Sequence, residues 1–513
     1  MSEIDFGKIE STEIFGYSPL DAGDLAQKIA AGSIPSELPG DFILVVEGQT
    51  SAQQSYVAVI VSAVCVLPYY IYHQRDRFIH GQNIFEVASK AQIDWQWNQD
   101  ALRAILALGF CLDRDSLHQD IERAAPATIY YCCEGKLTTV TDSFPTDIFN
   151  PAVAYSDRDT LQIYNDVFDE YYDNREVCLS LSAGYDSRVF LASFLERGIK
   201  PPVGTEGSPD SIDVLTATEI AKDFGLEHRT LELTETDFVR HADQIITATS
   251  GEIPLSAAWG PYLFFRQVGF PSNAIHLAGT NGGFFKANYS NREIFYRLAD
   301  LLPTPLLKQF FNAYLLYKKR PYQGFPLNKF NCFQQSSGSI SDRCYQLAKK
   351  VPNFSNQVDY FHTFNRVRNY TGKGLALYNL INLTSSPFLD PRMVRAGARL
   401  AKKYKLNCGF HQQILLDSCP QLAEYPMNGK NISPSRSTKY AWLEQKAQQP
   451  QKGPNIRTKL LQNAELIAIC DDSPHLDYFM ARPDRQRARE QGIFAIFSFL
   501  VSMHYVSEKI AAL

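Results

Sequence analysis

The 513-residue sequence has no long apolar run, which argues against a membrane-spanning helix. Its longest nearly apolar stretch, residues 56–67, is well short of the roughly 20 residues that such a helix needs. Residues 492–506 are also largely apolar but short and interrupted by His504, which favours a core helix. Residues 1–6 lack the basic and then apolar order of an export signal. We therefore expect no membrane partner and a cytoplasmic location.

The sequence also lacks paired cysteines and an excess of positive charge. None of its ten cysteines forms a C-x-x-C pair, so neither a structural zinc site nor a redox pair is expected. The net charge is −5, whereas binding to a nucleic-acid backbone requires a basic surface that releases counterions. We therefore expect reduced core thiols and no nucleic-acid partner.

The length predicts two domains, because one hydrophobic core rarely serves so long a chain. Residues 1–150 are mostly strand-like, which predicts an α+β sandwich, and a polar linker is expected within 141–157. Residues 151–513 alternate strand and helix, which predicts a doubly wound parallel sheet with helices on both faces and further helices after it. The run 56–67 is expected to form a buried pair of strands that ends before Pro68. The other expected strands are 41–46, 69–72, 77–79, 128–131, 177–181, 203–205, 228–233 and 274–278, and the expected helices are 25–31, 99–108, 161–171, 187–197, 210–224 and 238–248.

The most informative segment follows the strand expected at 177–181. The run Ser182-Ala183-Gly184-Tyr185-Asp186-Ser187 leads into a helix, and its small side chains would let backbone N–H groups approach phosphate oxygens. Ser182 and Ser187 would donate hydroxyls to the same phosphates, and Asp186 would supply the carboxylate that Mg²⁺ requires. An ordinary capped turn has a similar composition, but the order of strand, loop and helix favours a phosphate site.

This segment resembles the Ser-Gly-Gly-x-Asp-Ser loop of the ATP pyrophosphatase domains, with Ala183 in place of the first glycine. Several other segments, in the same order, resemble the asparagine synthetase B family. They are Gly40-Asp41-Phe42, Pro68-Tyr69-Tyr70, Gly225-Leu226-Glu227-His228, Pro387-Phe388-Leu389-Asp390, and Tyr425-Pro426 followed by Lys430. The resemblance implies a degenerate glutaminase-like sandwich over residues 1–150 and an adenylating ATP pyrophosphatase domain over residues 151–513.

The resemblance also implies roles for single residues and two cofactors, ATP and Mg²⁺. The implied nucleotide-binding set is Ser182, Ala183, Gly184, Asp186, Ser187, Val203, Gly204, Thr205 and Gly279. Within this set Asp186 would hold the metal, and residues 203–205 would hold adenine through backbone contacts. Lys430 would stabilise charge on the phosphate and on the tetrahedral intermediate. A surface lysine in a polar loop is the alternative interpretation of Lys430.

Several positions depart from the family's pattern. Ser2 stands where glutamine-using members have a cysteine, so the amine is expected to come with the substrate. Gly283 stands where the family has a second metal-binding Asp, and Leu383 where it has a Glu. Glu252 would be a substitute acid, and a solvated loop acid is the alternative interpretation of it. The glycines at 282 and 283 would leave room for a bulky substrate.

Among the members without that cysteine, the sequence is most similar to the cyclases that close lasso peptides such as microcins. Its total length, its reduced first domain, and the Gly282-Gly283 turn followed by Lys286 carry this similarity. The resemblance implies an ATP-dependent macrolactam synthetase that adenylates an Asp or Glu side chain of a leader-cleaved precursor peptide. The peptide's own N-terminal amine would then attack and close the ring, with release of AMP and pyrophosphate.

The implied partners are a ribosomal precursor peptide as substrate and a leader-removing cysteine protease. Three alternatives remain at this point. A small-molecule amide synthetase would be β-lactam synthetase-like or an ammonia-dependent, asparagine synthetase-like enzyme. A tRNA-thiolating enzyme shares the loop, although paired cysteines and a basic RNA domain are missing here. A non-catalytic scaffold of a biosynthetic complex would explain the missing acid at Gly283.

Overall fold

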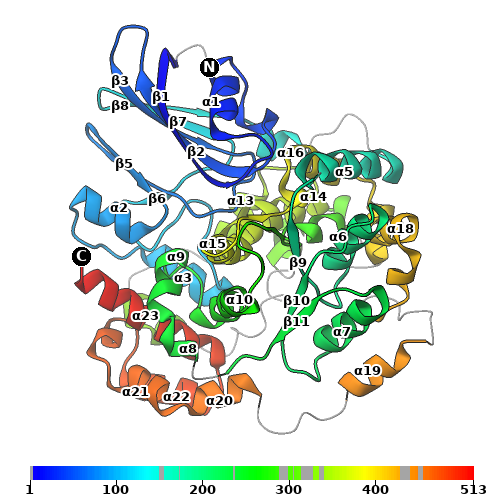
Figure 1. Cartoon of the computed structure of the whole chain (residues 1–513). Coiled ribbons are helices and arrows are strands. Elements are labelled where there is room, and N and C mark those ends of the chain that lie inside the picture. The colour runs from blue at the N-terminus through cyan, green and yellow to red at the C-terminus, as the bar shows by residue number, and fades with distance from the viewer. Residues whose placement is uncertain are drawn as a thin grey trace.

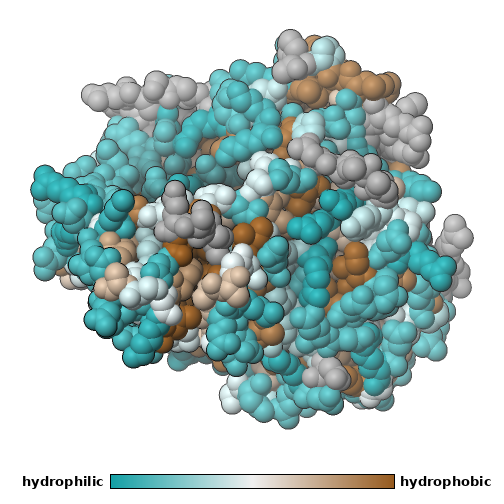
Figure 2. All heavy atoms as spheres, turned by 90° about the horizontal axis from the view of Figure 1, so that it is seen from above, coloured by the Kyte–Doolittle hydropathy of each residue, from teal (hydrophilic) through white to brown (hydrophobic). Residues whose placement is uncertain are grey.

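The computed structural model has a β-rich part and a larger part in which helices surround a second sheet (Figure 1). The residues that the structure describes are 4–149, 155–172, 174–234, 237–287, 298–303, 306–312, 327–333, 340–427, 439–448 and 455–513. Seen from above, the surface is largely hydrophilic with scattered apolar areas (Figure 2). Among the described helices, none combines the length and the apolar character that crossing a bilayer requires.

Five antiparallel strands form the first sheet, in the order β1-β2-β3-β7-β8. They are β1 (Lys8–Tyr17), β2 (Asp41–Gln49), β3 (Ser55–Val61), β7 (Thr128–Cys133) and β8 (Lys136–Thr141). Strand β2 is buried on both faces. Phe42 and Leu44 pack with Leu25 of α1 (Ala22–Ala30), whereas Ile43 packs with Ile71 of a second, smaller sheet. The first sheet is therefore a central layer between a helix and another sheet.

The smaller sheet has the strand order β5-β4-β6. Its strands are β5 (Arg77–Gly81), β4 (Tyr70–Gln74) and β6 (Glu122–Arg123), and the helices α2 (Ile84–Ala91) and α3 (Gln99–Leu108) follow β5 in the sequence. The side chains of Asn83 and Asn98 accept backbone N–H groups and thereby cap these two helices. Buried residues of α3 share one hydrophobic cluster with those of α23 (Phe494–Ala511), the helix expected from the run 492–506.

The run 56–67 forms one strand rather than the expected pair, because β3 ends at Val61. Residues 62–67 are buried. The Ser62 N–H still donates to the Phe42 carbonyl of β2, but beyond Ser62 the backbone bonds to side chains. The Val66 N–H donates to the Asp41 carboxylate at 3.2 Å, and Arg123 donates to the Val66 carbonyl at 2.6 Å. The apolar composition of residues 56–67 thus predicted their burial correctly, but it did not predict which groups their backbone would bond to.

The second sheet has five strands in the order β11-β10-β9-β12-β13, and all its neighbours are parallel. The strands are β9 (Val177–Ser180), β10 (Val203–Glu206), β11 (His228–Leu231), β12 (Ile275–Leu277) and β13 (Thr384–Ser385). Leu179 of β9 packs with Val189 of α6 (Tyr185–Glu196), whereas its neighbour Cys178 packs with Phe264 of α10 (Leu255–Val268). Because successive side chains of a strand point to opposite faces, helices cover both faces, which confirms the sequence expectation.

The expected helix at 210–224 is α7 (Ile212–Phe224), and the expected helix at 238–248 is divided into α8 (Asp237–Arg240) and α9 (Ala242–Thr249). Helix α10 was not expected. The remaining described α- and π-helices are α4 (Phe144–Asp147), α5 (Asp157–Tyr172), α13 (Ile340–Ala348), α14 (Phe354–Phe361), the π-helix η6 (His362–Thr371), α15 (Gly372–Asn379), α16 (Pro391–Arg399), α17 (Lys402–Lys405), α18 (Gly409–Ser418), α19 (Ala441–Ala447), α20 (Ile456–Gln462), α21 (Ala464–Asp472) and α22 (Arg482–Glu490).

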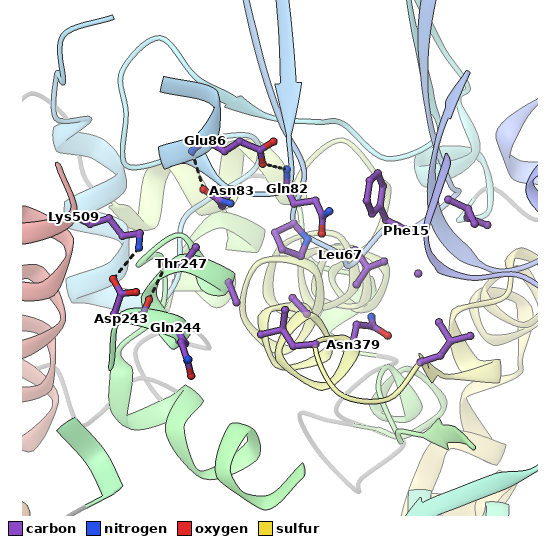
Figure 3. Close-up of a pocket in the computed structure, with 17 residues that line it drawn as sticks. Phe15, Leu67, Gln82, Asn83, Glu86, Asp243, Gln244, Thr247, Asn379 and Lys509 are labelled. Atoms are coloured by element: carbon purple, nitrogen blue, oxygen red, sulfur yellow. Dashed lines mark hydrogen bonds and ion pairs between the residues drawn. The ribbon is translucent and has the colours of Figure 1, made fainter. Parts of the chain in front are cut away.

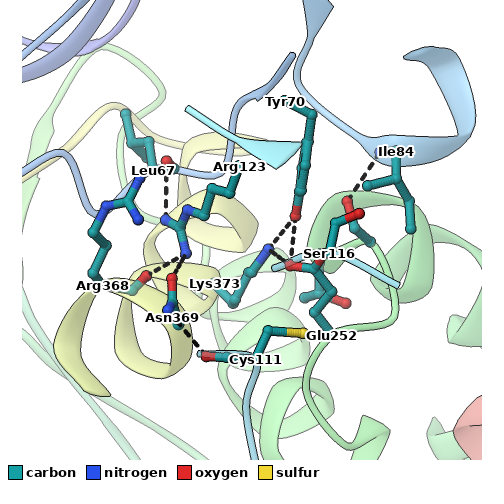
Figure 4. A network of polar contacts seen from close by, with 12 residues as sticks. Leu67, Tyr70, Ile84, Cys111, Ser116, Arg123, Glu252, Arg368, Asn369 and Lys373 are labelled. Carbon is teal, nitrogen blue, oxygen red and sulfur yellow. Dashed lines mark hydrogen bonds and ion pairs between the residues drawn. The ribbon is translucent and has the colours of Figure 1, made fainter. Parts of the chain in front are cut away.

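Two fully buried arginines connect the first 150 residues to η6 (Figure 4). Arg123 donates to the carbonyls of Leu67 and Arg368, at 3.1 and 2.8 Å. Arg368 donates to the carbonyls of Cys65 and Asp113, at 3.1 and 3.2 Å. Burial, and then the neighbouring Arg123 charge, lower the pKa of Arg368 to about 10, so the side chain remains charged near neutral pH. The antiparallel and parallel parts therefore share one buried polar network.

Tyr70, Glu252 and Lys373 form a second buried contact between the two parts (Figure 4). Lys373 Nζ lies 2.6 Å from Glu252 Oε2, and the two side chains are 0% and 1% exposed. The Tyr70 hydroxyl donates to the same oxygen at 2.7 Å. The interpretation of Glu252 as a solvated loop acid is therefore wrong. Its Oε2 is held in a buried ion pair, because an unpaired charge there would cost several kcal/mol, while Oε1 is buried without a hydrogen-bond partner among the described residues.

Replacing Lys373 by Met would leave the Glu252 carboxylate buried without a counter-charge. We expect this change to lower the free energy of unfolding by about 3–5 kcal/mol. Lys90→Met is the matched control, because Lys90 forms a 2.7 Å pair with Glu86 at the surface, and we expect it to cost less than about 0.5 kcal/mol. Urea unfolding followed by tryptophan fluorescence measures both changes, and equal effects would contradict the role of burial.

Candidate functional site

The turns that follow β9 and β12 meet at the carboxyl edge of the parallel sheet. Strand β9 is central, with β10 on one side and β12 on the other, so the strand order reverses between them. Ligands of open α/β sheets bind at such a reversal. The turn after β9 contains residues 182–187, and the turn after β12 contains residues 279–285. The sheet thus brings together the two turns that the sequence singled out.

Helix α6 begins at Tyr185 without a capping side chain. The residue before it, Gly184, has an extended backbone and makes no side-chain hydrogen bond to the helix start. The first amides of a helix have no acceptor within the helix, so their N–H groups form a positive end that attracts anions. The start of α6 is therefore the candidate anion-binding element of this edge.

The backbone N–H groups of the turn were expected to face phosphate oxygens, but three of them bond to side chains of the protein. The Ser182 and Gly184 N–H groups donate to the hydroxyls of Ser187 and Ser182, at 3.2 and 3.1 Å, and the Ala183 N–H donates to Asp213 Oδ1 at 2.9 Å. These three amides are already bonded within the protein, because two serines and an aspartate surround a very short turn. The serine hydroxyls can rotate to donate outward, so a phosphate would meet them and the first amides of α6.

Asp186 is held by two side chains from other elements. Lys286 Nζ lies 2.7 Å from its carboxylate, and His411 Nε2 of α18 lies 2.8 Å from Oδ1. Burial acts to raise the pKa of Asp186, but the Lys286 charge and His411 outweigh burial and hold the pKa well below its usual range. Burial, and then the Lys286 charge, lower the pKa of His411, so its ring is neutral. No local pattern pointed to His411, which lies 225 residues from Asp186 in the chain.

Mg²⁺ fits this group of residues through one carboxylate. Asp186 Oδ1 is buried beside Lys286 Nζ and His411 Nε2, at 2.7 and 2.8 Å, and the other ring nitrogen of His411, Nδ1, is buried without a hydrogen-bond partner among the described residues. Mg²⁺ commonly takes one or two carboxylates and completes its shell with waters and substrate phosphates. Within the described ranges, no three His, Cys, Asp or Glu side chains gather as a metal site. A single ion shared between Asp186 and a phosphate ligand is therefore what these residues allow.

Two glycines of the second turn make room for Asp186. A Cβ added to Gly279 would lie 2.6 Å from Asp186 Cβ, and one added to Gly282 would lie 2.3 Å from Asp186 Oδ1. The turn is fixed by Asn281, whose side-chain amide donates to the Phe388 carbonyl at 3.0 Å. Gly282 was expected to leave room for a bulky substrate. In the structure it instead allows the Asp186 carboxylate to lie close to the backbone of the second turn.

Arg188 connects the first turn to a distant segment. This side chain is fully buried and donates to the carbonyls of Ala183, Leu422 and Tyr425, at 2.8, 3.0 and 3.0 Å. Lys430, the expected late lysine, lies outside the described residues and follows Pro426 by four positions in the sequence. Residues 422–426, which precede Lys430 in the sequence, are therefore anchored at the turn after β9. The sequence reasoning missed Arg188, although a charged residue directly before the apolar run 189–192 was a usable signal.

The expected adenine-binding residues 203–205 lie in strand β10. The Val203 N–H donates to the Glu227 carbonyl, and the Gly204 carbonyl accepts from the Leu181 N–H, both at 2.8 Å. Because the sheet uses these groups, a base would meet the strand only at its end, from Thr205 onward. Thr205 itself is buried, and its hydroxyl donates to the Leu181 carbonyl at 2.8 Å.

Glu206 is the acidic residue at this edge that the sequence reasoning missed. It is the last residue of β10, and burial raises its pKa to about 7. Its carboxylate packs against α10, since a Cβ added to Gly260 would lie 2.4 Å from Glu206 Oε1. A carboxyl group that changes charge near neutral pH at a ligand-binding edge is a functional candidate. Glu206 directly follows the strand expected at 203–205, and this position could have identified it from the sequence.

A cavity of about 730 Å³ lies between the antiparallel part and the helices α9 and α15 (Figure 3). It falls within the volume range of ordinary ligand sites. Side-chain amides of Gln82, Asn83, Gln244 and Asn379 line it together with apolar side chains such as Leu67. Carboxamides both donate and accept hydrogen bonds, so they match the peptide group. Leu383, where the family's Glu was expected, also lines this cavity.

No protein-family model matches the chain, and no curated protein matches it significantly. The functional inference therefore rests on the residues of the site and on the geometry that the sheet gives them.

Gly282→Ala tests the close approach to Asp186. The added Cβ would collide with Asp186 Oδ1 at 2.3 Å, and we expect a loss of about 1–3 kcal/mol in the free energy of unfolding. Gly374→Ala in α15 is the control, because its Cβ would meet nothing within 4 Å; alanine should stabilise this helix by about 0.5–1 kcal/mol. Chemical unfolding measures both, and a neutral Gly282→Ala would contradict the contact.

The raised pKa of Glu206 predicts a pH dependence of stability. The carboxyl group titrates near 4.5 when exposed and near 7 when folded. Between these values the folded state binds more protons, so this contribution is complete below the lower value and is lost as pH rises through the higher one. The stability of the protein should fall by on the order of 2 kcal/mol relative to Glu206→Gln between about pH 4.5 and 8. A pH-independent difference between the two proteins would contradict it.

Proposed function

We propose that the protein is an ATP-dependent, AMP-forming amide ligase of the asparagine synthetase-like type, and specifically a macrolactam synthetase that closes a lasso peptide. The observation that carries this proposal is the meeting of the uncapped start of α6, the ionised Asp186 and the Lys286 ammonium at the strand reversal. A triphosphate would meet a positive helix end, a cation and a carboxylate suited to Mg²⁺ there. In this proposal the antiparallel part is a degenerate glutaminase-like domain.

A carboxylate is a poor electrophile, so an amine cannot attack it directly, and adenylation converts it into an activated acyl group. In the proposed reaction a carboxylate oxygen of a peptide Asp or Glu attacks the α-phosphorus of ATP, and pyrophosphate leaves. The N-terminal amine of the peptide then attacks the acyl carbon, loses a proton, and AMP leaves. Mg²⁺, when bound at Asp186, supplies charge neutralisation for the departing phosphates. Lys430, outside the described residues, is proposed to stabilise the tetrahedral intermediate.

The cavity in Figure 3 is the candidate site for the body of a peptide substrate, and none of its lining residues belongs to the turns after β9 and β12. The side-chain oxygens of Asn83, Gln244 and Asn379 accept hydrogen bonds within the protein. Their N–H groups can donate to peptide C=O groups, while Leu67 and Leu380 offer apolar contact. If one peptide supplies both reacting groups, ring closure is intramolecular and avoids the entropy cost of a second encounter. The proposed partners are a ribosomal precursor peptide and the cysteine protease that removes its leader.

A specific observation favours a second candidate, a non-catalytic scaffold. The amides of Ser182, Ala183 and Gly184 are bonded within the protein, and Asp186 is paired with Lys286. A scaffold would keep its effect in the pathway after Asp186 is replaced, whereas a ligase would lose it. A small-molecule amide synthetase would instead release pyrophosphate with free amino acids or β-amino acids.

Asp186→Asn tests the ligase directly. We expect the wild-type protein, with the protease, ATP, Mg²⁺ and a candidate precursor, to give a product lighter by one water together with AMP and pyrophosphate. Removing the only metal-binding carboxylate of the turn should lower pyrophosphate release by at least about 100-fold. Asp169→Asn is the matched control, because Asp169 pairs with Arg197 on the exposed side of α5. Formation of ADP, or no AMP with any precursor, would contradict adenylation.

A further inference from the structure

Lys286 is fixed by the turn that precedes it. The short 3-10 turn η2 (Gly282–Phe285) ends directly before Lys286, and Phe285 is fully buried against Phe410 with the ring centroids 5.2 Å apart. After the lysine, the Ala287 N–H donates to the Lys405 carbonyl at 2.9 Å. The side chain of Lys286 is 18% exposed. Its ammonium is therefore placed by main-chain and aromatic contacts on both flanks.

The Lys286 ammonium lies beside the start of α6. Its Nζ is 2.7 Å from each oxygen of Asp186, and Asp186 is the second residue of that helix. A lysine side chain is a flexible stem with three donors, so its charge can move by several ångströms while the main chain stays in place. An anion bound at the helix start would thus lie within reach of Nζ.

The second turn carries no charge of its own other than this lysine. Residues 279–287 include no acid, so Asp186 is the one carboxylate that faces Lys286 from these two turns. One divalent cation at Asp186 would neutralise only part of a triphosphate. His411, the other side chain beside Asp186, is fully buried and faces the carboxylate at 2.8 Å, whereas Lys286 is partly exposed. The remaining phosphate charge requires a cation that the protein itself supplies.

We propose that Lys286 is the built-in counter-cation for the β- and γ-phosphates and works beside a single Mg²⁺ ion at Asp186. When nucleotide binds, the ammonium moves from the Asp186 carboxylate to the phosphate oxygens, and one carboxylate oxygen becomes free for the ion. No bond is made or broken by Lys286 in this exchange. The inference rests on the proposed function, which it deepens by naming the residue that receives the pyrophosphate.

The test is direct binding of pyrophosphate and of a nonhydrolysable ATP analogue by calorimetry over a series of Mg²⁺ concentrations. Lys286→Met should weaken binding by about 10- to 100-fold, as the loss of a charge-assisted hydrogen bond implies, and added Mg²⁺ should not restore it. Lys286→Arg should bind within a few-fold of the wild type. In the wild type, affinity should rise with the first power of Mg²⁺ concentration.

Lys405→Met is the matched control for loss of a buried ammonium. Lys405 Nζ lies 2.9 Å from Asp359 and 4.7 Å from the centre of the Phe284 ring, so the change disturbs the same turn without touching Asp186. We expect its pyrophosphate affinity to equal that of the wild type. If Lys286→Met fails to fold, Lys286→Gln keeps a donor for Asp186 without the charge and makes the same prediction.

Two results would overturn the inference while the ligase proposal stands. One is wild-type affinity for pyrophosphate in Lys286→Met, and the other is a second-power dependence of wild-type binding on Mg²⁺, which would require two ions. A wild-type protein that binds neither pyrophosphate nor the ATP analogue, and forms no AMP, would instead contradict the proposed function itself.

Discussion

The ion pair between Asp186 and Lys286 is the interaction on which the site depends. It joins the turns after β9 and β12, which are separated by about a hundred residues in the sequence and lie next to each other only because the strand order reverses there. Burial works against the charge of Asp186, and the ammonium restores it. The two glycines that admit Asp186 so closely belong to the same arrangement, since any side chain at 279 or 282 would separate the charges.

A second constraint holds the antiparallel part against the rest of the molecule. Arg123 and Arg368 are buried with carbonyl groups as their acceptors, and Glu252 pairs with Lys373 at the same boundary. Buried charges are costly unless every donor finds an acceptor at a fixed place. Such a network permits little sliding of one part over the other, because a small displacement would leave several charges unsatisfied at once. The antiparallel part is therefore integral to the fold.

Most strands and helices could be predicted from the sequence, because apolar periodicity reports directly which face is buried. Strand β9, helix α6 and the turn between them follow from local pattern alone. The features that could not be predicted have a common cause, because contacts between distant segments produce no periodic pattern in the sequence. The loop at 62–67 has the composition of a strand, but Arg123 from another element bonds its carbonyls. Glu252 has the flanking residues of a solvated loop, yet its partner Lys373 lies 121 residues away.

The candidate site divides in the same way. The turn at 182–187 and the Asp186 carboxylate are local features and were predicted, and the sheet order explains why residues 279–282 adjoin them. His411 and Glu206 were missed, because their importance comes from burial beside groups that the sequence does not place. The hydrogen bonds of the turn amides were missed for a related reason, since the acceptor Asp213 is on the next helix.

Arg188 has a consequence for how this chain tolerates change. Its guanidinium is bound to backbone carbonyls of residues 422–426, which every amino acid provides, and to no side chain there. The hydrogen bonds of Arg188 therefore depend on the path of the main chain at residues 422–426 and not on the side chains there. Substitutions there would leave the contact with Arg188 in place, although the buried Leu422 and Tyr425 have packing partners of their own. One inserted residue, in contrast, would shift the carbonyls out of register with the single planar group that holds them.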